Sequence, residues 1–448
     1  MDFLTFLPQF GSLFMTLLAF VVALSVIVAV HEYGHYIVGR WSGIKADVFS
    51  LGFGPVLYSR VDRHGTRWQF ALLPFGGYVN FMGDANAASA NAVDTVQDLP
   101  PEVKRQTMLG APLWARALTV AAGPVFNFIL SILVFAAVMM TQGKMAEPLA
   151  VGEMRPLPVE GITLQPGDEL VSIAQQPVPG MDEGAAFDDF IDTLPLAPLL
   201  DYEVRRAGAV TSARGPHPLP PLAVQLAPQS AAFAVDMAPG DVITAVDGTP
   251  VHAFSELKEI VEGSDGRVLR VDVWRAGEAL EFALAPKRVD EPLPEGGFQT
   301  TWRIGISGGF AFEPATETLG PVAALVGGVE QTARVVTGSL SGLYHMVTGA
   351  ISSCNMSGPI GIAQVSGAMA SQGAQSFIWF IAVLSAAVGL LNLLPVPILD
   401  GGHLVFYAYE SVVGKPPSEG ALRILMAVGL SLVLGLMVFA LANDLFCP

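Results

Sequence analysis

The stretch VIVAVHEYGHYIVGR, residues 26–40, decides the fold because it ends a long apolar run with two histidines and a glutamate. Residues 3–30 contain no Lys, Arg, Asp, Glu or His, so the run exceeds the ~20 apolar residues that a membrane-spanning helix needs. An ionisable side chain near the bilayer centre costs roughly 2.5–3.5 kcal/mol. The stretch therefore predicts a membrane helix with a functional site at one end.

Three further uncharged stretches predict a multi-pass α-helical membrane protein. They are residues 117–143, 377–394 and 424–442. The composition agrees, because 52% of the residues are hydrophobic and only 14% are charged. We expect about four transmembrane helices. We do not expect the first to be a cleaved signal, since no basic residue precedes it and its apolar part is too long.

The basic residues predict the orientation in the membrane. No Lys or Arg precedes Arg40, basic residues cluster from Arg40 to Arg116, and none follows Arg423. Cytoplasmic loops carry the excess of Lys and Arg. We therefore expect the loop between the first two spans to be cytoplasmic, and both termini and the long middle region to lie outside.

Net charge and cysteine content argue against two kinds of site. A net charge of −17 argues against a nucleic-acid partner, because phosphate binding needs clustered Lys and Arg. Cys354 and Cys447 are far apart and neither belongs to a C-x-x-C motif. We therefore predict neither a disulfide framework nor a thiol-ligated metal.

The middle region contains an internal repeat. LQPGDELVSIAQQPV at 164–178 and MAPGDVITAVDGTPV at 237–251 match at a spacing of 73 residues, which predicts two tandem domains. In the second copy a strand, a helix and a strand pair follow, and this order resembles a circularly permuted PDZ domain. Such domains bind peptide C-termini by adding a strand. A generic β-rich domain is the alternative. The first copy is a weaker match, because we expect no clean hairpin over its proline-rich residues 195–221.

The first loop predicts a small sheet at the membrane. Residues 56–74 alternate polar and apolar side chains on either side of a turn at 62–65, which indicates a hairpin. The small polar residues from 85 to 98 indicate a flexible loop.

His31, Glu32 and His35 form the motif H-E-x-x-H. Residues four apart share one face of a helix, so both imidazoles can bind one metal, with Glu32 close to a water on that metal. Imidazole nitrogens suit zinc, and a catalytic zinc has three protein ligands and an open position. The alternative is a polar helix end that matches by chance.

Asp400 is the candidate for the third ligand. It is the first acidic residue after a run without charged side chains from 335 to 399, and prolines and glycines around it interrupt helical hydrogen bonding at membrane depth. Such irregular backbone is tolerated where it lines a wet cavity. His403 is the competing ligand or an outer partner of Asp400. Asn392 can bind a backbone carbonyl, or it can join two helices.

Taken together, these motifs resemble the site-2 protease family of intramembrane zinc metalloproteases, in its Gram-negative bacterial branch. The resemblance covers nearly the whole chain. Its motifs are HEYGH, GFG at 52–54, PFGGYVNF at 74–81, AAGPVFNF at 121–128, the repeat, SGPIGIA at 357–363 and LDG at 399–401.

The resemblance implies a Zn²⁺ cofactor, with Asp400 as third ligand and Glu32 as the base. It also implies an inner-membrane location and single-span membrane substrates that another protease has already trimmed, above all an anti-sigma factor, and remnant signal peptides. An unwound substrate is expected to pair with the hairpin at Gly76, Gly77 and Tyr78, with Asn392 holding its backbone.

The expected organisation has eight parts. They are a first membrane helix (1–40), a hairpin region and loop (41–112), a second membrane helix (113–143), two PDZ-like domains (147–225 and 226–290), a linker with amphipathic or apolar helices (291–372), a third membrane segment with LDG (373–412) and a fourth membrane helix (420–445).

Two other functions remain open at this point. A membrane scaffold would use the PDZ-like copies alone and would bind no stoichiometric zinc. A transporter would also use membrane His and Asp, but the chain lacks the inverted repeat that transporters commonly show.

Overall fold

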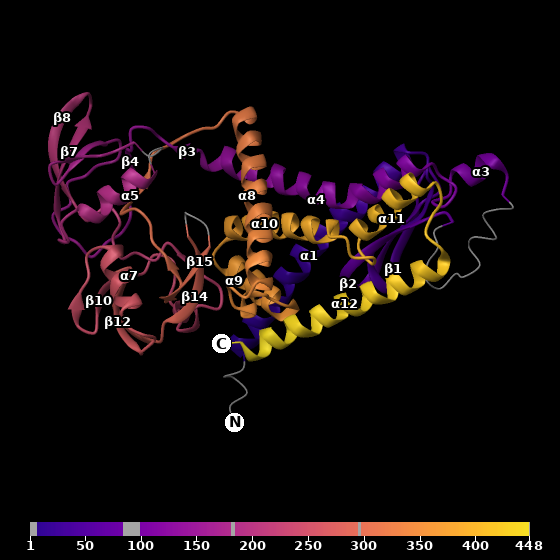
Figure 1. Ribbon diagram of the computed structural model, residues 1–448. Coiled ribbons are helices and arrows are strands. Elements are labelled where there is room, and N and C mark those ends of the chain that lie inside the picture. The colour runs from indigo at the N-terminus through magenta and orange to yellow at the C-terminus, as the bar shows by residue number, and fades with distance from the viewer. Residues whose placement is uncertain (1–6, 84–98, 181–183, 294–296, 448) are drawn as a thin grey trace. The chain divides into compact units, whose positions relative to one another are not determined.

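The computed structural model describes residues 7–83, 99–180, 184–293 and 297–447 (Figure 1). The chain forms two compact units. The first unit comprises Met1–Val138, Val322–Val347 and Ser353–Pro448, and the second comprises Met139–Pro321 and Thr348–Ser352. The loop expected at 85–98 lies outside the described residues.

The first unit is mainly helical. Four helices are long and apolar enough to cross a membrane, which agrees with the four predicted spans. Large apolar side chains along them are exposed, for example Ile424 and Val438, as a lipid-facing surface requires. The helices are α1 (Leu7–Trp41), α3 (Pro101–Arg105), α4 (Leu113–Gln142), α8 (Pro321–Val347), η2 (Ser353–Asn355), α9 (Pro359–Ser371), α10 (Ala374–Leu393), α11 (Asp400–Val413) and α12 (Glu419–Phe446).

Small residues bring the helices of this unit close together. At Gly34 of α1 a β-carbon would meet the carbonyl oxygen of Ala122 and the ring of Phe126 on α4. At Gly389 of α10 it would meet Asn127 of α4. Helices in a membrane associate through such close van der Waals packing, since lipid provides no hydrophobic force between them. Helix α4 is therefore packed against both α1 and α10.

The predicted hairpin is present as β1 (Ala46–Val61) and β2 (Arg67–Phe81). Residues 56–61 of β1 pair with 67–71 of β2 across the turn, while 46–51 pair with 77–81. Residues 48–51 also have partners in 67–70. The stretch 48–51 is therefore central, and 77–81 of β2 lies at an edge of the sheet.

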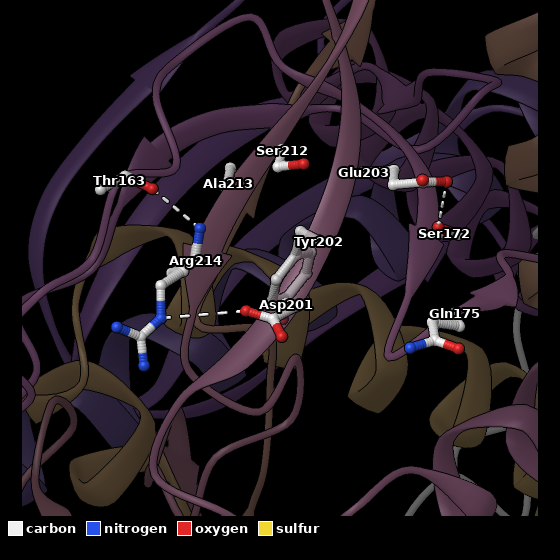
Figure 2. Close-up of a pocket in the computed structure, with 9 residues that line it drawn as sticks. All are labelled: Thr163, Ser172, Gln175, Asp201, Tyr202, Glu203, Ser212, Ala213 and Arg214. Atoms are coloured by element: carbon white, nitrogen blue, oxygen red, sulfur yellow. Dashed lines mark hydrogen bonds and ion pairs between the residues drawn. The ribbon is translucent and has the colours of Figure 1, made fainter.

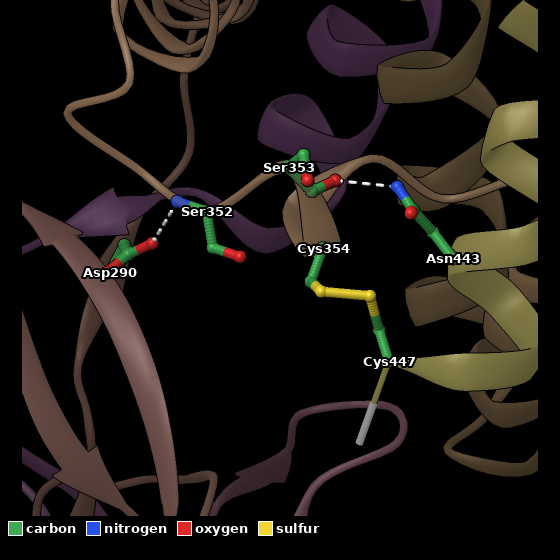
Figure 3. Close-up of a disulfide and its surroundings, with 6 residues drawn as sticks. All are labelled: Asp290, Ser352, Ser353, Cys354, Asn443 and Cys447. Carbon is green, nitrogen blue, oxygen red and sulfur yellow. Dashed lines mark hydrogen bonds between the residues drawn. A yellow bond between two sulfur atoms is a disulfide. The ribbon is translucent and has the colours of Figure 1, made fainter.

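The expectation of no disulfide is wrong. Cys354 and Cys447 form a disulfide, 93 residues apart in sequence, that joins η2 to the residue that follows α12 (Figure 3). The Asn443 side chain donates a hydrogen bond to the Ser353 carbonyl beside it. Asp444, the next residue of α12, accepts hydrogen bonds from the backbone N–H groups of Gly358, Ile360 and Gly361. The sequence motif SGPIGIA thus begins a helix whose N-terminal N–H groups are capped by α12.

The second unit holds the two repeats as two four-stranded sheets, of order β6-β5-β7-β8 and β11-β10-β12-β13. Each has its own apolar core and one helix, α5 (Gly184–Thr193) or α7 (Phe254–Glu262). The sheet strands are β5 (Glu169–Ile173), β6 (Gln176–Pro177), β7 (Leu200–Arg206), β8 (Ala209–Gly215), β10 (Val242–Val246), β11 (Thr249–Pro250), β12 (Leu269–Arg275) and β13 (Glu278–Leu284), and the short helix α6 (Ala231–Ala234) precedes β10.

The aspartate of each PGD turn explains why the motif repeats. Asp168 and Asp241 are fully buried, and each is held by two bonds from an arginine, Arg206 or Arg275, at the end of a later strand. A buried carboxylate needs such a partner. The first copy also has a complete hairpin, β7–β8, so the expectation that it lacks one is wrong. The sequence signal for this hairpin is Arg-Ala-Gly at 206–208, which matches the Arg-Ala-Gly at the end of β12.

After the second repeat the chain returns to the first. The segment expected to be a linker from residue 291 begins with strands, and Phe312, from β17, is fully buried in the core of the first repeat. The second repeat is therefore inserted into the first. The strands outside the two sheets form the pairs β14 (Lys287–Pro292) with β15 (Phe298–Arg303), β16 (Ile306–Ser307) with β9 (Gln225–Leu226), β17 (Phe312–Pro314) with β4 (Val151–Met154), and β18 (Thr316–Glu317) with β3 (Lys144–Met145).

Candidate metal centre

Two helices of the first unit bring His31, His35 and Asp400 together. One donor atom from each lies within 4.8 Å of the other two. The distances are 3.1 Å between the two Nε2 atoms, 3.1 Å from His31 Nε2 to Asp400 Oδ2, and 3.6 Å from His35 Nε2 to Asp400 Oδ2. Of the two candidates for a third ligand, Asp400 rather than His403 reaches both imidazoles.

These distances fit one small cation. Zinc bonds of about 2.0–2.1 Å in a tetrahedron place neighbouring donor atoms about 3.3–3.4 Å apart. The three observed distances bracket this value. Asp400 Oδ2 is also buried and accepts no hydrogen bond within the described part of the chain. Two imidazole nitrogens and a carboxylate oxygen are the donor set of a catalytic zinc site with one position left open.

Local sequence explains how Asp400 is placed. Helix α10 stops at Leu393, and α11 begins at Asp400 itself, so the carboxylate lies in the first turn of a helix, where the helix dipole favours a negative charge. The backbone folds tightly between them. A β-carbon at Gly401 would collide with the carbonyl oxygens of Leu393 and Leu394. The LDG motif thus needs its glycine for close backbone contact.

Helix α4 lies behind both imidazoles. His35 Nδ1 donates a hydrogen bond to the carbonyl oxygen of Thr119 at 2.9 Å, which leaves the Nε2 lone pair of the neutral ring free to bind a metal. The Asn127 side chain lies 3.1 Å from His31 Nδ1. Between them is Gly123, where a β-carbon would collide with both rings. Sequence reasoning named this stretch only as the motif AAGPVFNF and assigned its residues no role.

Glu32 lies between α1 and the edge of the hairpin. A β-carbon at Gly77 would come within 3.3 Å of its Cγ atom, so the backbone of β2 passes directly by the glutamate. Glu32 is thus next to His31 in the sequence of α1, and its side chain lies against the edge strand at Gly77. Tyr78 follows on the same strand, and its hydroxyl accepts a hydrogen bond from Gln69.

The structure brings the remaining predicted residues less close. Asn392 is half-buried in the last turn of α10, and no contact joins its amide to the three donor atoms in the part of the chain that the structure describes. Gly76 packs against Phe53, where a β-carbon would collide with the ring. Neither residue belongs to the donor set.

A buried ion pair holds α11 against α4. The Arg116 guanidinium donates two hydrogen bonds to the Glu410 carboxylate, at 2.6 and 3.1 Å, and the two side chains are only 12% and 16% exposed. Sequence reasoning missed this pair, because 294 residues separate its members. It joins the helix that carries Asp400 to the helix that backs the histidines.

A polar hollow on the first repeat is a different kind of feature (Figure 2). Its polar groups bond to one another: Ser172 donates to Glu203, the Arg214 backbone N–H donates to Thr163, and Arg214 pairs with Asp201. It carries no cluster of metal-binding groups among the described residues. The chemistry thus centres on α1 and α11. The hollow is lined by Thr163, Ser172, Gln175, Asp201, Tyr202, Glu203, Ser212, Ala213 and Arg214.

Comparison with known proteins supports a peptidase. Residues 19–436 match the model of peptidase family M50. A protein of Rhizobium meliloti that carries the name of a zinc metalloprotease is 36% identical over 435 residues, 96% of both chains. A similarly named protein of Agrobacterium fabrum is 35% identical over 98% of both chains. The regulator of sigma-E protease RseP of Salmonella typhimurium is 31% identical over 97% of this chain and 99% of its own length.

Proposed function

The chain belongs to peptidase family M50 and is a zinc metalloprotease of the site-2 type, and on that premise we propose that it hydrolyses peptide bonds within membrane-spanning segments. The proposed substrates are single-span membrane proteins whose outer domain has been removed, such as an anti-sigma factor, and remnant signal peptides. The observation that carries the proposal is the convergence of His31, His35 and Asp400 in an apolar helical unit, where Glu32 follows His31 on the same helix.

The zinc ligands in this proposal are His31 Nε2, His35 Nε2 and Asp400 Oδ2. Their mutual distances and the unpartnered carboxylate oxygen support the assignment. Zinc, when bound, activates a water molecule for attack and polarises the peptide carbonyl. Helix α4 keeps both rings in place through Thr119 and Asn127.

Glu32 acts as the general base in the proposed mechanism. Its carboxylate takes the proton from the attacking water and passes it to the leaving amide nitrogen, so one residue serves both halves of the reaction. The amine then departs as a neutral group, and the new carboxyl end keeps the oxygen of the water. Glutamine at this position can occupy the same space but cannot accept the proton.

The edge of the hairpin presents the substrate to Glu32. A transmembrane helix hides its carbonyl groups in internal hydrogen bonds and must unwind before attack. Residues 77–81 lie at the edge of the sheet, and Gly77 is beside Glu32. An unwound substrate segment that pairs with this edge as an added strand is brought to the carboxylate. Asn392, in the last turn of α10, is proposed to hold the backbone of the unwound substrate.

We propose that the hairpin faces the cytoplasm and that both termini and the two repeats lie outside, in the periplasm. The distribution of basic residues supports this orientation. The Cys354–Cys447 disulfide adds support, since disulfides persist in oxidising compartments such as the periplasm.

The repeats are proposed to act as PDZ-like modules that exclude substrates with a bulky outer domain. The second repeat supports this role with a cleft between α7 and the chain from the end of β15 to the start of β16, with Glu291 of β14. Hydrophobic side chains line much of it, and Lys258, Glu291 and Arg303 are its charged lining residues. Such a cleft suits an extended peptide. It is lined by Phe254, Leu257, Lys258, Val261, Glu291, Arg303, Ile304, Gly305 and Ile306.

The test of the enzyme mechanism compares purified wild type with Glu32→Gln on a single-span model substrate, with bound zinc measured in both. We expect the variant to retain zinc and to lose cleavage, because only the proton acceptor is removed. Cleavage by Glu32→Gln at a rate near that of wild type would contradict the assignment of Glu32.

The exclusion role needs a deletion that spares the rest of the chain. Met145 and Thr316 are paired neighbours in β3 and β18, so a short Gly-Ser linker can replace residues 146–315 between them. The shortened chain should cleave both trimmed and untrimmed substrate. If it cleaves the trimmed form and still rejects the untrimmed one, the repeats do not set the size limit.

A further inference from the structure

Asn127 is a polar residue in the middle of the apolar helix α4. Its side chain has no exposed surface. The amide lies 3.1 Å from His31 Nδ1, and Oδ1 is buried with no hydrogen-bond partner among the described residues. A buried amide in a membrane protein is costly unless it has a partner or a function. Within the described ranges, the one side chain that it faces at hydrogen-bond distance is a proposed zinc ligand.

The orientation of this amide decides which nitrogen of His31 carries the proton. In the structure the Asn127 Nδ2 atom is the one that faces Nδ1. In that orientation the amide would donate to a lone pair of Nδ1, and the proton of the neutral ring would lie on Nε2. That nitrogen could not bind a metal, and its proton would point at His35 Nε2 and Asp400 Oδ2, both 3.1 Å away. If the amide oxygen faces Nδ1 instead, it accepts the Nδ1 proton and the Nε2 lone pair is free.

No other group fixes the amide in the first orientation. No donor from the described part of the chain approaches Oδ1, and exchanging the oxygen and nitrogen leaves every heavy-atom position unchanged. His35 shows the pattern expected of a ligand, since its Nδ1–H donates to the Thr119 carbonyl. Metal-bound histidines almost always donate their second N–H to such an outer oxygen.

We propose that Asn127 is a positioning residue of the zinc site, whose amide oxygen accepts the Nδ1 proton of His31 and so presents the Nε2 lone pair to the metal. This inference rests on the zinc ligands proposed above. Helix α4 then supplies one oxygen to each histidine, from Thr119 and from Asn127. The backbone of Asn127 is itself fixed, because its carbonyl accepts a hydrogen bond from Ser385 of α10 at 2.9 Å.

The test measures zinc affinity of the full chain by competition with a chelator, independently of proteolysis. Asn127→Leu keeps the size of the side chain and removes the acceptor, so zinc affinity should fall 10- to 100-fold, the usual effect of losing an outer partner. Asn127→Asp places an oxygen at both positions and should bind zinc at least as tightly as wild type. The matched control is Ser131→Ala, one turn further along α4, which removes a buried hydroxyl that contacts Thr332 rather than an imidazole.

Two results would overturn the inference. One is wild-type zinc affinity in Asn127→Leu. The other is zinc binding by Asn127→Asp at least tenfold weaker than wild type, which would mean that an N–H donor is required, and this comparison also stands if the leucine variant fails to fold. Failure of the proposed function is distinct, because the wild-type chain itself would then bind no stoichiometric zinc.

Discussion

Gly123→Ala is a one-carbon change that tests how closely α4 supports the histidines. The new β-carbon would lie 2.5 Å from His35 Cε1 and 2.8 Å from His31 Cε1, where ordinary contact begins at 3.4 Å. The β-carbon would come closer still to His35 Nε2, so the rings or the helices must move by about 0.6–0.9 Å to clear the two carbons and by more to clear that nitrogen. Such a shift matters, because misplacing a catalytic group by about 1 Å can cost on the order of 100-fold in rate.

We expect Gly123→Ala to cleave a model substrate about 100-fold more slowly than wild type and to bind zinc more weakly. Alanine is the better helix former by about 1 kcal/mol, so loss of the helix cannot explain the defect. Gly435→Ala in α12 is the matched control, because a β-carbon there meets nothing within 4 Å. The control should cleave at the wild-type rate. Unchanged cleavage and zinc affinity in Gly123→Ala would refute the placement of α4 behind the two rings.

Three further perturbations concern stability. Glu410→Leu leaves Arg116 buried without its partner and should lower the free energy of unfolding by roughly 3–5 kcal/mol. In a thermal unfolding assay, the double variant with Arg116→Met should recover much of this loss. No recovery would contradict the ion pair. Burial alone would raise the pKa of Asp168, but its bonds from Arg206 outweigh this and lower the pKa, so its stabilisation is present at neutral pH and is lost as the pH falls below about 4. Asp168→Asn should therefore flatten the acid limb of a plot of melting temperature against pH, and an unchanged slope would count against the pair. Replacing both cysteines by serine should destabilise the chain by about 4–5 kcal/mol, as expected for a closed loop of this length. The wild-type chain should react with a thiol reagent only after reduction. Reaction without reduction would exclude the disulfide.

Features written in short sequence patterns could be predicted. Four uncharged stretches predicted the spans, the spacing of His31 and His35 predicted that they share a helix face, and the turn at 62–65 predicted a hairpin. Each depends on residues within one helix or one turn. Asp400 could be proposed as their partner because a lone carboxylate in an apolar region must have a reason to be there.

Features that depend on distant packing could not be predicted. Nothing near Cys354 or Cys447 in the sequence indicates that the ends of α9 and α12 meet. The return of β17 to the first repeat likewise depends on a core that accepts Phe312 after a long insertion. Asn127 was visible only as part of a motif, since its role arises from the packing of α4 against α1. Local periodicity does not specify which distant elements will pack together.

The most direct test of the central claim is the amount of zinc bound per chain in three purified proteins: wild type, Asp400→Ala and His403→Ala. The account predicts close to one zinc in wild type and in His403→Ala and a large loss in Asp400→Ala, because Asp400 is the carboxylate that reaches both imidazoles among the residues that the structure describes. Full zinc content in Asp400→Ala, with loss in His403→Ala, would contradict it.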